Sequence, residues 1–277
     1  MSPTDIDKTQ LTGVDLQCNT TGSGDPVLLI SNGPIADSFL PFVSQSALAD
    51  HYRLIRYRQR RLATGTRDPE PVSFVQHAAD AAALLGQLGI RRAHVAGHST
   101  GAAIALQLAV DCPEMVHTLV LLEPPLMSVP SAGAFFAAAG PALAAFGAGD
   151  REGAMASFMS MVSGLDWKAC RAHVETNIPG GVAQAIEDAD NFFGSYLPAL
   201  SAWQFGGKEA AAISQPMLSV LGVQTERLFA EGHDLLHTWF PQLEDCVIED
   251  VGHLLQMQRP DPVARGVAEF FARHRMG

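Results

Sequence analysis

One five-residue segment restricts the fold of this chain more than any other. Gly97-His98-Ser99-Thr100-Gly101 lies between a short apolar stretch, residues 94–96, and an alanine- and leucine-rich stretch, residues 102–110. A serine with glycines at this spacing, after a strand and before a helix, is typical of a strained turn that lifts the hydroxyl out of a sheet. The pattern predicts Ser99 as a nucleophile at a helix amino end, where developing negative charge is favoured. The alternative, a glycine-rich turn with an incidental serine, leaves the flanking strand and helix unexplained.

Apolar runs and helical periodicity alternate along the rest of the chain. We expect strands at residues 27–30, 52–57, 94–96, 117–122, 217–221 and 246–248. Helices are expected at residues 73–88 and 102–110, and in a final helix with Asp261 as N-cap and Pro262 in its first turn. Strands that alternate with helices predict an α/β fold with a mostly parallel sheet and right-handed crossovers.

The alternation stops between Leu122 and Met217, where the sequence is typical of helix and loop only. We expect residues 127–214 to form a helical cap inserted into one core, which residues 1–126 and 215–277 make up. A chain of 277 residues suits one core with one inserted subdomain. The uncharged segment 132–149 is mostly alanine and contains a proline, so it predicts a pair of buried or half-buried helices and no membrane span.

The net charge and the cysteines indicate which binding partners and which cellular compartment to expect. A net charge of −11 argues against a nucleic-acid partner, which would need clustered Lys and Arg. The four cysteines are scattered without CxxC spacing, which favours reduced thiols in a cytoplasmic protein over a zinc site or a disulfide framework. The first ten residues are polar, so no signal peptide is expected. The sequence leaves a homo-oligomer open.

His253 is the histidine that fits a partner for Ser99. It follows the last expected strand and precedes the last helix, within Val251-Gly252-His253-Leu254-Leu255. This position predicts a general base that deprotonates Ser99 and then a general acid for the leaving group. His233 and His237 are spaced i, i+4 on an expected helix, but without an HExxH pattern they predict a partly exposed helix face and no metal site.

The acid that would orient His253 has two candidates. A Gly-x-x-Asp turn often supplies it, but here Thr225 takes the Asp position and Glu226 follows one residue later. Glu123 directly follows the expected strand 117–122, so it lies at the carboxyl edge of the sheet, where catalytic groups gather. A buried carboxylate there needs a partner, and an imidazole N–H provides one. We therefore favour Glu123 over Glu226.

An oxyanion hole needs two N–H donors beside Ser99. The Thr100 backbone N–H is one, because it directly follows the nucleophile. The second is expected from the loop after residue 30, where Pro34 has no N–H and leaves Gly33 or Ile35. We choose Gly33.

The expected cap is rich in apolar side chains that could line a substrate pocket. The candidates are Phe135, Phe136, Phe158, Met159, Met161, Phe192, Phe193 and Trp203. Of these we select Trp203 and Phe136 as substrate-binding, together with Pro34 of the oxyanion loop. The alternative is that such residues form the cap's own core.

With Ser99, Glu123 and His253 in these positions, the chain resembles α/β hydrolases whose acid follows the sixth strand, and zearalenone-lactonase-like enzymes in particular. The resemblance runs along the core and is weak in the cap. It implies an α/β-hydrolase fold and hydrolysis of a small apolar ester or lactone through a Ser-His-Glu triad and an acyl-enzyme. It implies no metal and no organic cofactor. It does not select zearalenone as the substrate, because substrate choice lies in the cap.

Two other functions stay open at this point. The same triad could hydrolyse the C–C bond of a diketone or carry out perhydrolysis. A different class is a ligand receptor that keeps the triad but turns over slowly.

Overall fold

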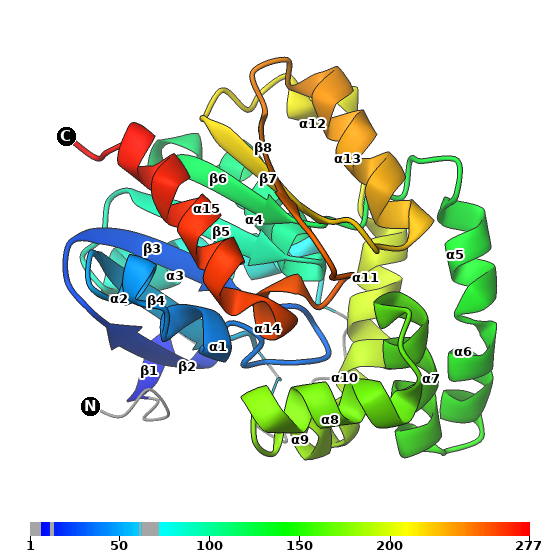
Figure 1. The fold of residues 1–277 in the computed structure, drawn as a ribbon. Coiled ribbons are helices and arrows are strands. Elements are labelled where there is room, and N and C mark those ends of the chain that lie inside the picture. Colours follow the sequence, from blue (N-terminus) through cyan, green and yellow to red (C-terminus); the bar gives the residue numbers. More distant parts are fainter. Residues whose placement is uncertain (1–6, 12–13, 61, 63–71) are drawn as a thin grey trace.

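A twisted sheet forms the centre of the molecule in the computed structural model, which describes residues 7–11, 14–60, 62 and 72–277 (Figure 1). In these residues it has eight strands in the order β1-β2-β4-β3-β5-β6-β7-β8. β1 and β2 pair antiparallel, as do β2 and β4, whereas all neighbours from β4 across to β8 are parallel. The strands are β1 (Asp7–Leu11), β2 (Val14–Thr21), β3 (Asp25–Ile30), β4 (Tyr52–Arg58), β5 (Ala93–His98), β6 (Val116–Leu122), β7 (Met217–Gly222) and β8 (Glu244–Ile248).

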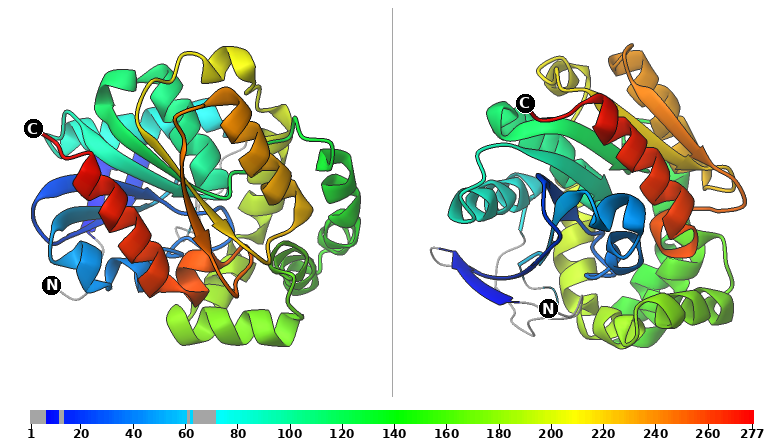
Figure 2. Two further views of the ribbon diagram at one scale, coloured as in Figure 1. Left: turned by 45° about the horizontal axis from the view of Figure 1, so that its top comes forward. Right: turned by 60° about the vertical axis from the view of Figure 1, so that its left-hand side comes forward.

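Helices cover both faces of the parallel part, which is why its central strands are buried on both faces and mostly apolar. In β3, Leu28 and Ile30 pack toward α3 and α4, while Val27 and Leu29 pack toward α1, α2 and α15. Figures 1 and 2 show these two helical layers on opposite sides of the sheet. Their bounds are α1 (Leu40–Val43), α2 (Ser46–Ala49), α3 (Phe74–Gln87), α4 (Thr100–Asp111) and α15 (Pro260–Arg273), with η1 (Pro113–Met115) after α4 and α14 (Leu255–Gln258) before α15.

The expected α/β fold with a mostly parallel sheet is confirmed, and each of the six strands expected from apolar runs is present. The N-cap role of Ser73 agrees with the expected start of the helix, since its hydroxyl accepts the Gln76 N–H at 3.2 Å. Two strands were not expected, β1 and β2, because their sequences are polar and they occupy the antiparallel edge of the sheet.

The start of the last helix was placed wrongly. α15 begins at Pro260 with Arg259 in the N-cap position, so Asp261 lies inside the first turn and forms no cap. There its carboxylate pairs with Arg265 one turn later, at 2.5 Å. A proline at the first helical position explains the earlier start, because it needs no hydrogen-bond acceptor for an N–H.

Between β6 and β7 the chain contains helices only. Most of them lie together beside the sheet, whereas the last one, at Gly207–Ala210, lies next to the helix Arg227–Trp239 (Figure 1). That this segment acts as a separate cap, as expected for residues 127–214, stays a prediction. No helix in the described ranges has the length and apolar character needed to cross a membrane. The helices are α5 (Ala132–Ala138), α6 (Gly140–Gly147), α7 (Arg151–Ser163), α8 (Trp167–Asn177), α9 (Gly181–Glu187), α10 (Ala189–Asn191), the π-helical η2 (Phe192–Tyr196), α11 (Leu197–Ala202) and α12 (Gly207–Ala210). After β7 follows α13 (Arg227–Trp239).

The turn between β5 and α4 is packed too tightly for side chains at its two glycines. A Cβ on Gly97 would lie 2.3 Å from the Gly101 carbonyl oxygen, and one on Gly101 would lie 2.1 Å from the Ile30 carbonyl oxygen. Both obstacles are backbone atoms, which cannot move aside without shifting a helix or a strand. The glycines therefore let α4 approach β5 and β3 closely.

We predict that Gly97→Ala lowers the free energy of unfolding by about 3 kcal/mol or more, as overpacking against backbone does. Gly86→Ala on α3 is the control, because nothing lies within 4 Å of the added methyl group. In a helix it should be neutral or raise stability by up to about 1 kcal/mol. Urea denaturation of both variants measures the difference. Equal stability of Gly97→Ala and the wild type would contradict the tight turn.

Candidate active site

Ser99 sits at the point where β5 ends and α4 begins. Its backbone has φ +55° and ψ −124°, a conformation that a residue with a side chain adopts only under strain. The Ser99 N–H donates to the Leu122 carbonyl at 2.9 Å, which ties the turn to the end of β6. The strained turn places Ser99 at the carboxyl edge of the sheet, in agreement with the sequence motif.

His253 lies in the loop between β8 and α14 and is buried, with 3% of its surface exposed. Its Nδ1–H donates to Glu123 Oε2 at 2.6 Å. One face of the ring stacks on Phe229 of α13, with centroids 3.8 Å apart and planes at 11°, and His98 lies 4.7 Å away. A carboxylate and two rings thus fix the orientation of the imidazole.

Glu123 follows β6 directly and is 1% exposed. Oε1 accepts the Gly222 N–H at 2.9 Å, and Oε2 accepts the Thr225 hydroxyl at 2.7 Å in addition to the His253 Nδ1–H. Thr225, in the position where an Asp is often found, therefore donates a hydrogen bond to Glu123. The carboxylate is fully paired, as a buried charge must be.

The structure brings Glu123, and not Glu226, to His253. Glu226 is exposed at the N-cap position of α13, where its side chain forms no capping hydrogen bond. It takes no part in the hydrogen bonds around the imidazole.

His98 is fully buried behind His253. Its Nδ1 accepts from the Asn32 amide at 3.0 Å and from the Gln256 amide at 2.8 Å, and its Nε2–H donates to the His253 carbonyl at 2.8 Å. Burial lowers the pKa of His98 well below its ordinary value, so the ring is neutral. Sequence reasoning missed Asn32 and Gln256, although Asn32 lies in the loop after β3 that was searched for oxyanion donors.

The loop after β3 faces Ser99 but does not offer the expected backbone donor. The Gly33 N–H donates to the Thr100 hydroxyl at 2.9 Å, and the Ile35 N–H donates to Asn32 Oδ1 at 2.8 Å. Pro34 between them has no N–H. The expectation for Gly33 thus differs from the structure, because the Thr100 side chain already accepts its amide hydrogen. The Thr100 N–H, at the first position of α4, has no acceptor within the helix.

Side chains of the helical segment hold this loop in place. Gln59 Nε2 donates to the Ser31 carbonyl at 2.7 Å, and the Tyr196 hydroxyl donates to Gln59 Oε1. A Cβ on Gly33 would lie 2.9 Å from the Tyr196 ring and 3.0 Å from the Phe192 ring. The loop is therefore packed directly against η2.

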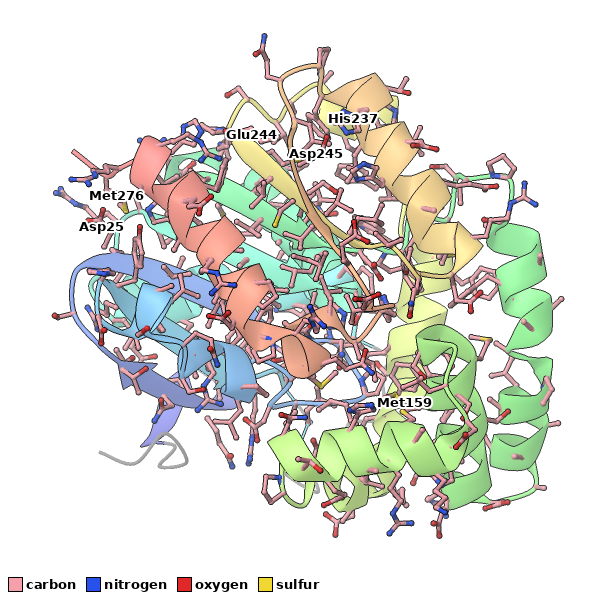
Figure 3. All side chains as sticks on the ribbon, viewed as in Figure 1. Asp25, Met159, His237, Glu244, Asp245 and Met276 are labelled. Atoms are coloured by element: carbon pink, nitrogen blue, oxygen red, sulfur yellow. The ribbon has the colours of Figure 1, made fainter. Side chains whose placement is uncertain are left out.

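Ser99 and His253 line one pocket between the core and the helices that follow β6. No hydrogen bond joins their side chains, both of which belong to the described residues. The rest of the lining is mainly apolar, and Figure 3 shows Met159 where α7 faces the core. The other lining residues are Asn32, Pro34, Thr100, Pro125, Phe135, Phe158, Met159, Val162, Phe192, Leu197, Leu200, Phe229 and Leu254.

Pro34 lines this pocket as expected, but Phe136 and Trp203 do not. Phe136 is next to Phe135 on α5, and consecutive helical residues point about 100° apart, so only Phe135 faces the pocket. Trp203 stacks on Phe205 at 4.9 Å, and its Nε1–H donates to Gln107 on α4 at 2.9 Å. This tryptophan packs the helical segment onto α4.

Solved structures that resemble nearly the whole chain include an enol-lactonase and Est816. The enol-lactonase from Burkholderia xenovorans LB400 has a TM-score of 0.78 and 18% sequence identity, covering 96% of this chain and 100% of that one. Est816, described as an N-acyl homoserine lactone degrading enzyme, has a TM-score of 0.69 and 25% identity, covering 95% of this chain and 100% of that one. The likeness of both structures to nearly the whole chain supports the fold described above.

Comparison with curated sequences and with family models identifies the family of this chain. Rhodomycin D methylesterase DnrP from Streptomyces peucetius is 37% identical over 110 residues, which are 36% of this chain and 37% of the relative. The chain spans about two fifths of the length of the curated relatives it matches. The model of the alpha/beta hydrolase family matches residues 27–266, from β3 into α15. The chain therefore belongs to the alpha/beta hydrolase family.

Proposed function

We propose that this protein is a hydrolase that cleaves a carboxylic ester or lactone through an acyl-enzyme on Ser99. The observation that carries the proposal is the buried 2.6 Å contact of His253 Nδ1 with Glu123, in the pocket that Ser99 also lines. This contact leaves Nε2 as the ring nitrogen available for a proton from the serine. Similarity to a methylesterase and to two lactonases supports the same chemistry.

In the proposed reaction His253 removes the Ser99 proton while the serine oxygen attacks the ester carbonyl. Glu123 holds the imidazole in the required tautomer and stabilises the imidazolium that forms. The protonated His253 then donates to the leaving alcohol, and a water molecule activated by the same ring releases the acid. The hydrogen bond between serine and histidine forms as the substrate fills the pocket, since catalytic contacts often tighten in the bound state. None of these steps uses a metal or an organic cofactor.

We assign the two oxyanion donors to the Thr100 N–H and the Asn32 side-chain amide. Asn32 lines the pocket with Ser99, and one hydrogen of its amide is committed to His98 Nδ1. The second hydrogen is left for a substrate oxygen. Because Oδ1 accepts the Ile35 N–H, the amide is held in a fixed orientation before the substrate arrives. Pre-oriented donors of this kind are what stabilises a developing oxyanion.

We propose a small apolar substrate, because the pocket is lined by aromatic and aliphatic side chains apart from Ser99, His253, Asn32 and Thr100. The helices between β6 and β7 supply Phe135, Phe158 and Phe192 to its wall, so this segment would set specificity. The likeness to zearalenone-lactonase-like enzymes favours a lactone within this class.

The decisive experiment is turnover by the wild type and Ser99→Ala on a panel of p-nitrophenyl esters, lactones and diketones. We expect ester or lactone turnover to fall by about 10⁴-fold or more, because the triad acts as a unit. A fluorophosphonate probe should label the wild type at Ser99 and leave Ser99→Ala unlabelled. Ser201→Ala, at an exposed position on α11, is the control. Full activity in Ser99→Ala, or turnover of diketones alone, would refute the proposal.

Two Glu→Gln variants test which glutamate orients His253. Glu123→Gln should fold but favour the wrong imidazole tautomer, which costs on the order of 10²- to 10⁴-fold in kcat. Glu226→Gln should keep kcat within about twofold, since surface substitutions away from a site have small effects. Both are assayed on one substrate, with circular dichroism as the check on folding. An active Glu123→Gln beside an inactive Glu226→Gln would move the acid to the loop after β7.

Asn32→Ala tests the second oxyanion donor. Loss of one such donor should lower kcat by about 10²- to 10³-fold while KM changes little, because the hydrogen bond strengthens only in the transition state. Asn32→Asp keeps an acceptor for the Ile35 N–H but removes the amide hydrogens, so it should be equally impaired. A kcat for Asn32→Ala near that of the wild type would place the donor elsewhere.

A further inference from the structure

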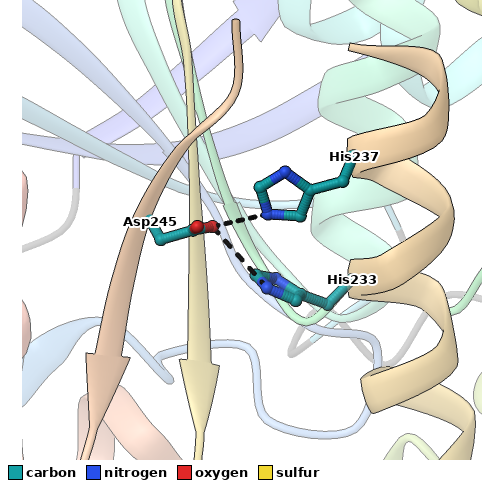
Figure 4. Close-up of side chains that lie close together, drawn as sticks. All are labelled: His233, His237 and Asp245. Carbon is teal, nitrogen blue, oxygen red and sulfur yellow. Dashed lines mark hydrogen bonds and ion pairs between the residues drawn. The ribbon is translucent and has the colours of Figure 1, made fainter. Parts of the chain in front are cut away.

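A second group of polar side chains lies on α13 and β8, outside the pocket. His233 and His237 are one turn apart on α13, and Asp245 lies opposite them on β8 (Figure 4). Asp245 Oδ1 is 3.0 Å from His237 Nε2 and 3.6 Å from His233 Nε2. One ligand atom from each residue falls within 4.8 Å of the other two. Figure 3 shows His237 and Asp245 far from Met159 of the pocket.

A hydrogen bond on the far side of the ring from Asp245 fixes the orientation of His233. Its Nδ1 is hydrogen-bonded to the Ser219 hydroxyl at 2.8 Å, and Ser219 is buried on β7, 2% exposed. A bond of this kind to the second ring nitrogen is the usual support for a metal-binding imidazole, because it fixes the ring and the tautomer. With Nδ1 bonded to Ser219, Nε2 is the ring nitrogen that faces Asp245.

The two distances from Asp245 Oδ1 to the imidazole nitrogens are compatible with a small divalent ion. With bonds of about 2.0–2.1 Å, the ligand atoms of a tetrahedral zinc site lie about 3.3 Å apart. The two separations from Asp245 Oδ1 lie on either side of that value. The side chains of His237 and Asp245 are 39% and 42% exposed, so solvent water can reach the open side. Two imidazoles and a carboxylate suit zinc and its neighbours better than magnesium or calcium.

We propose that His233, His237 and Asp245 bind one divalent transition-metal ion of the zinc class through two imidazole Nε2 atoms and one carboxylate oxygen, with water completing the coordination. The ion would join α13 to β8. These two elements flank the active site, because α13 carries Phe229 against His253 and β8 leads into the His253 loop. The metal thus has a structural role at this edge of the sheet and takes no part in hydrolysis. The inference is independent of the proposed function.

The test is isothermal titration of zinc chloride into the full chain, freed of any affinity tag and in buffer without chelators. We expect one zinc ion per chain, with an increase in Tm of about 5 °C or more at a hundredfold excess over Kd. His237→Gln and Asp245→Asn should each weaken zinc binding by at least about 10-fold, the lower bound for loss of an outer-shell partner. His173→Gln, exposed on α8, is the matched control and should keep wild-type affinity.

Each outcome decides the proposal. Saturable one-to-one binding that is lost in the two variants and kept in His173→Gln supports it. No saturable binding to the wild type overturns it, as does wild-type affinity in both variants, which would place the ion elsewhere. Because His237 and Asp245 are at the surface, the variants should match the Tm of the metal-free wild type, and this comparison separates lost ligation from lost folding.

Discussion

The buried carboxylate of Glu123 is the point at which the separate parts of this protein meet. It accepts hydrogen bonds from the end of β7, from the turn before α13 and from the loop after β8, through Gly222, Thr225 and His253. A charge with 1% exposure is stable only if such partners are in place. The positive φ of Glu123, 48°, adds local strain that these three bonds hold. The same contacts that satisfy the charge therefore also order the last third of the core.

Behind the histidine, a second and neutral network links the two sides of the pocket. His98 accepts the Asn32 and Gln256 amides and donates to the His253 backbone. Its neighbours thus include both the proposed base and the proposed oxyanion donor. Because the imidazole is buried and uncharged, it can position them without competing for the proton that moves during the reaction.

The sequence contained enough information for the parallel sheet and for the pairing of Glu123 with His253. Apolar runs identify buried strands. The turn around Ser99 and the position of Glu123 at the end of a strand can each be recognised from a few neighbouring residues. Polar strands such as β1 and β2 have no such signal. The hydrogen bond from the Gly33 N–H to the Thr100 side chain could not be predicted, because it joins residues 67 positions apart. Phe136 and Trp203 lie outside the pocket that Ser99 lines, because an apolar sequence pattern does not show which space a side chain borders.

The packing of η2 on the loop after β3 limits how members of this family can diverge in sequence. Gly33 has no room for a side chain beneath Phe192 and Tyr196, and Tyr196 is hydrogen-bonded through Gln59 to the backbone of the same loop. The helical segment and the loop therefore form one unit, although about 160 residues separate them in the chain. A helical segment exchanged alone from another member of the family would meet a loop shaped for different rings. Transferring the proposed substrate specificity onto this core would therefore require both the helical segment and the loop.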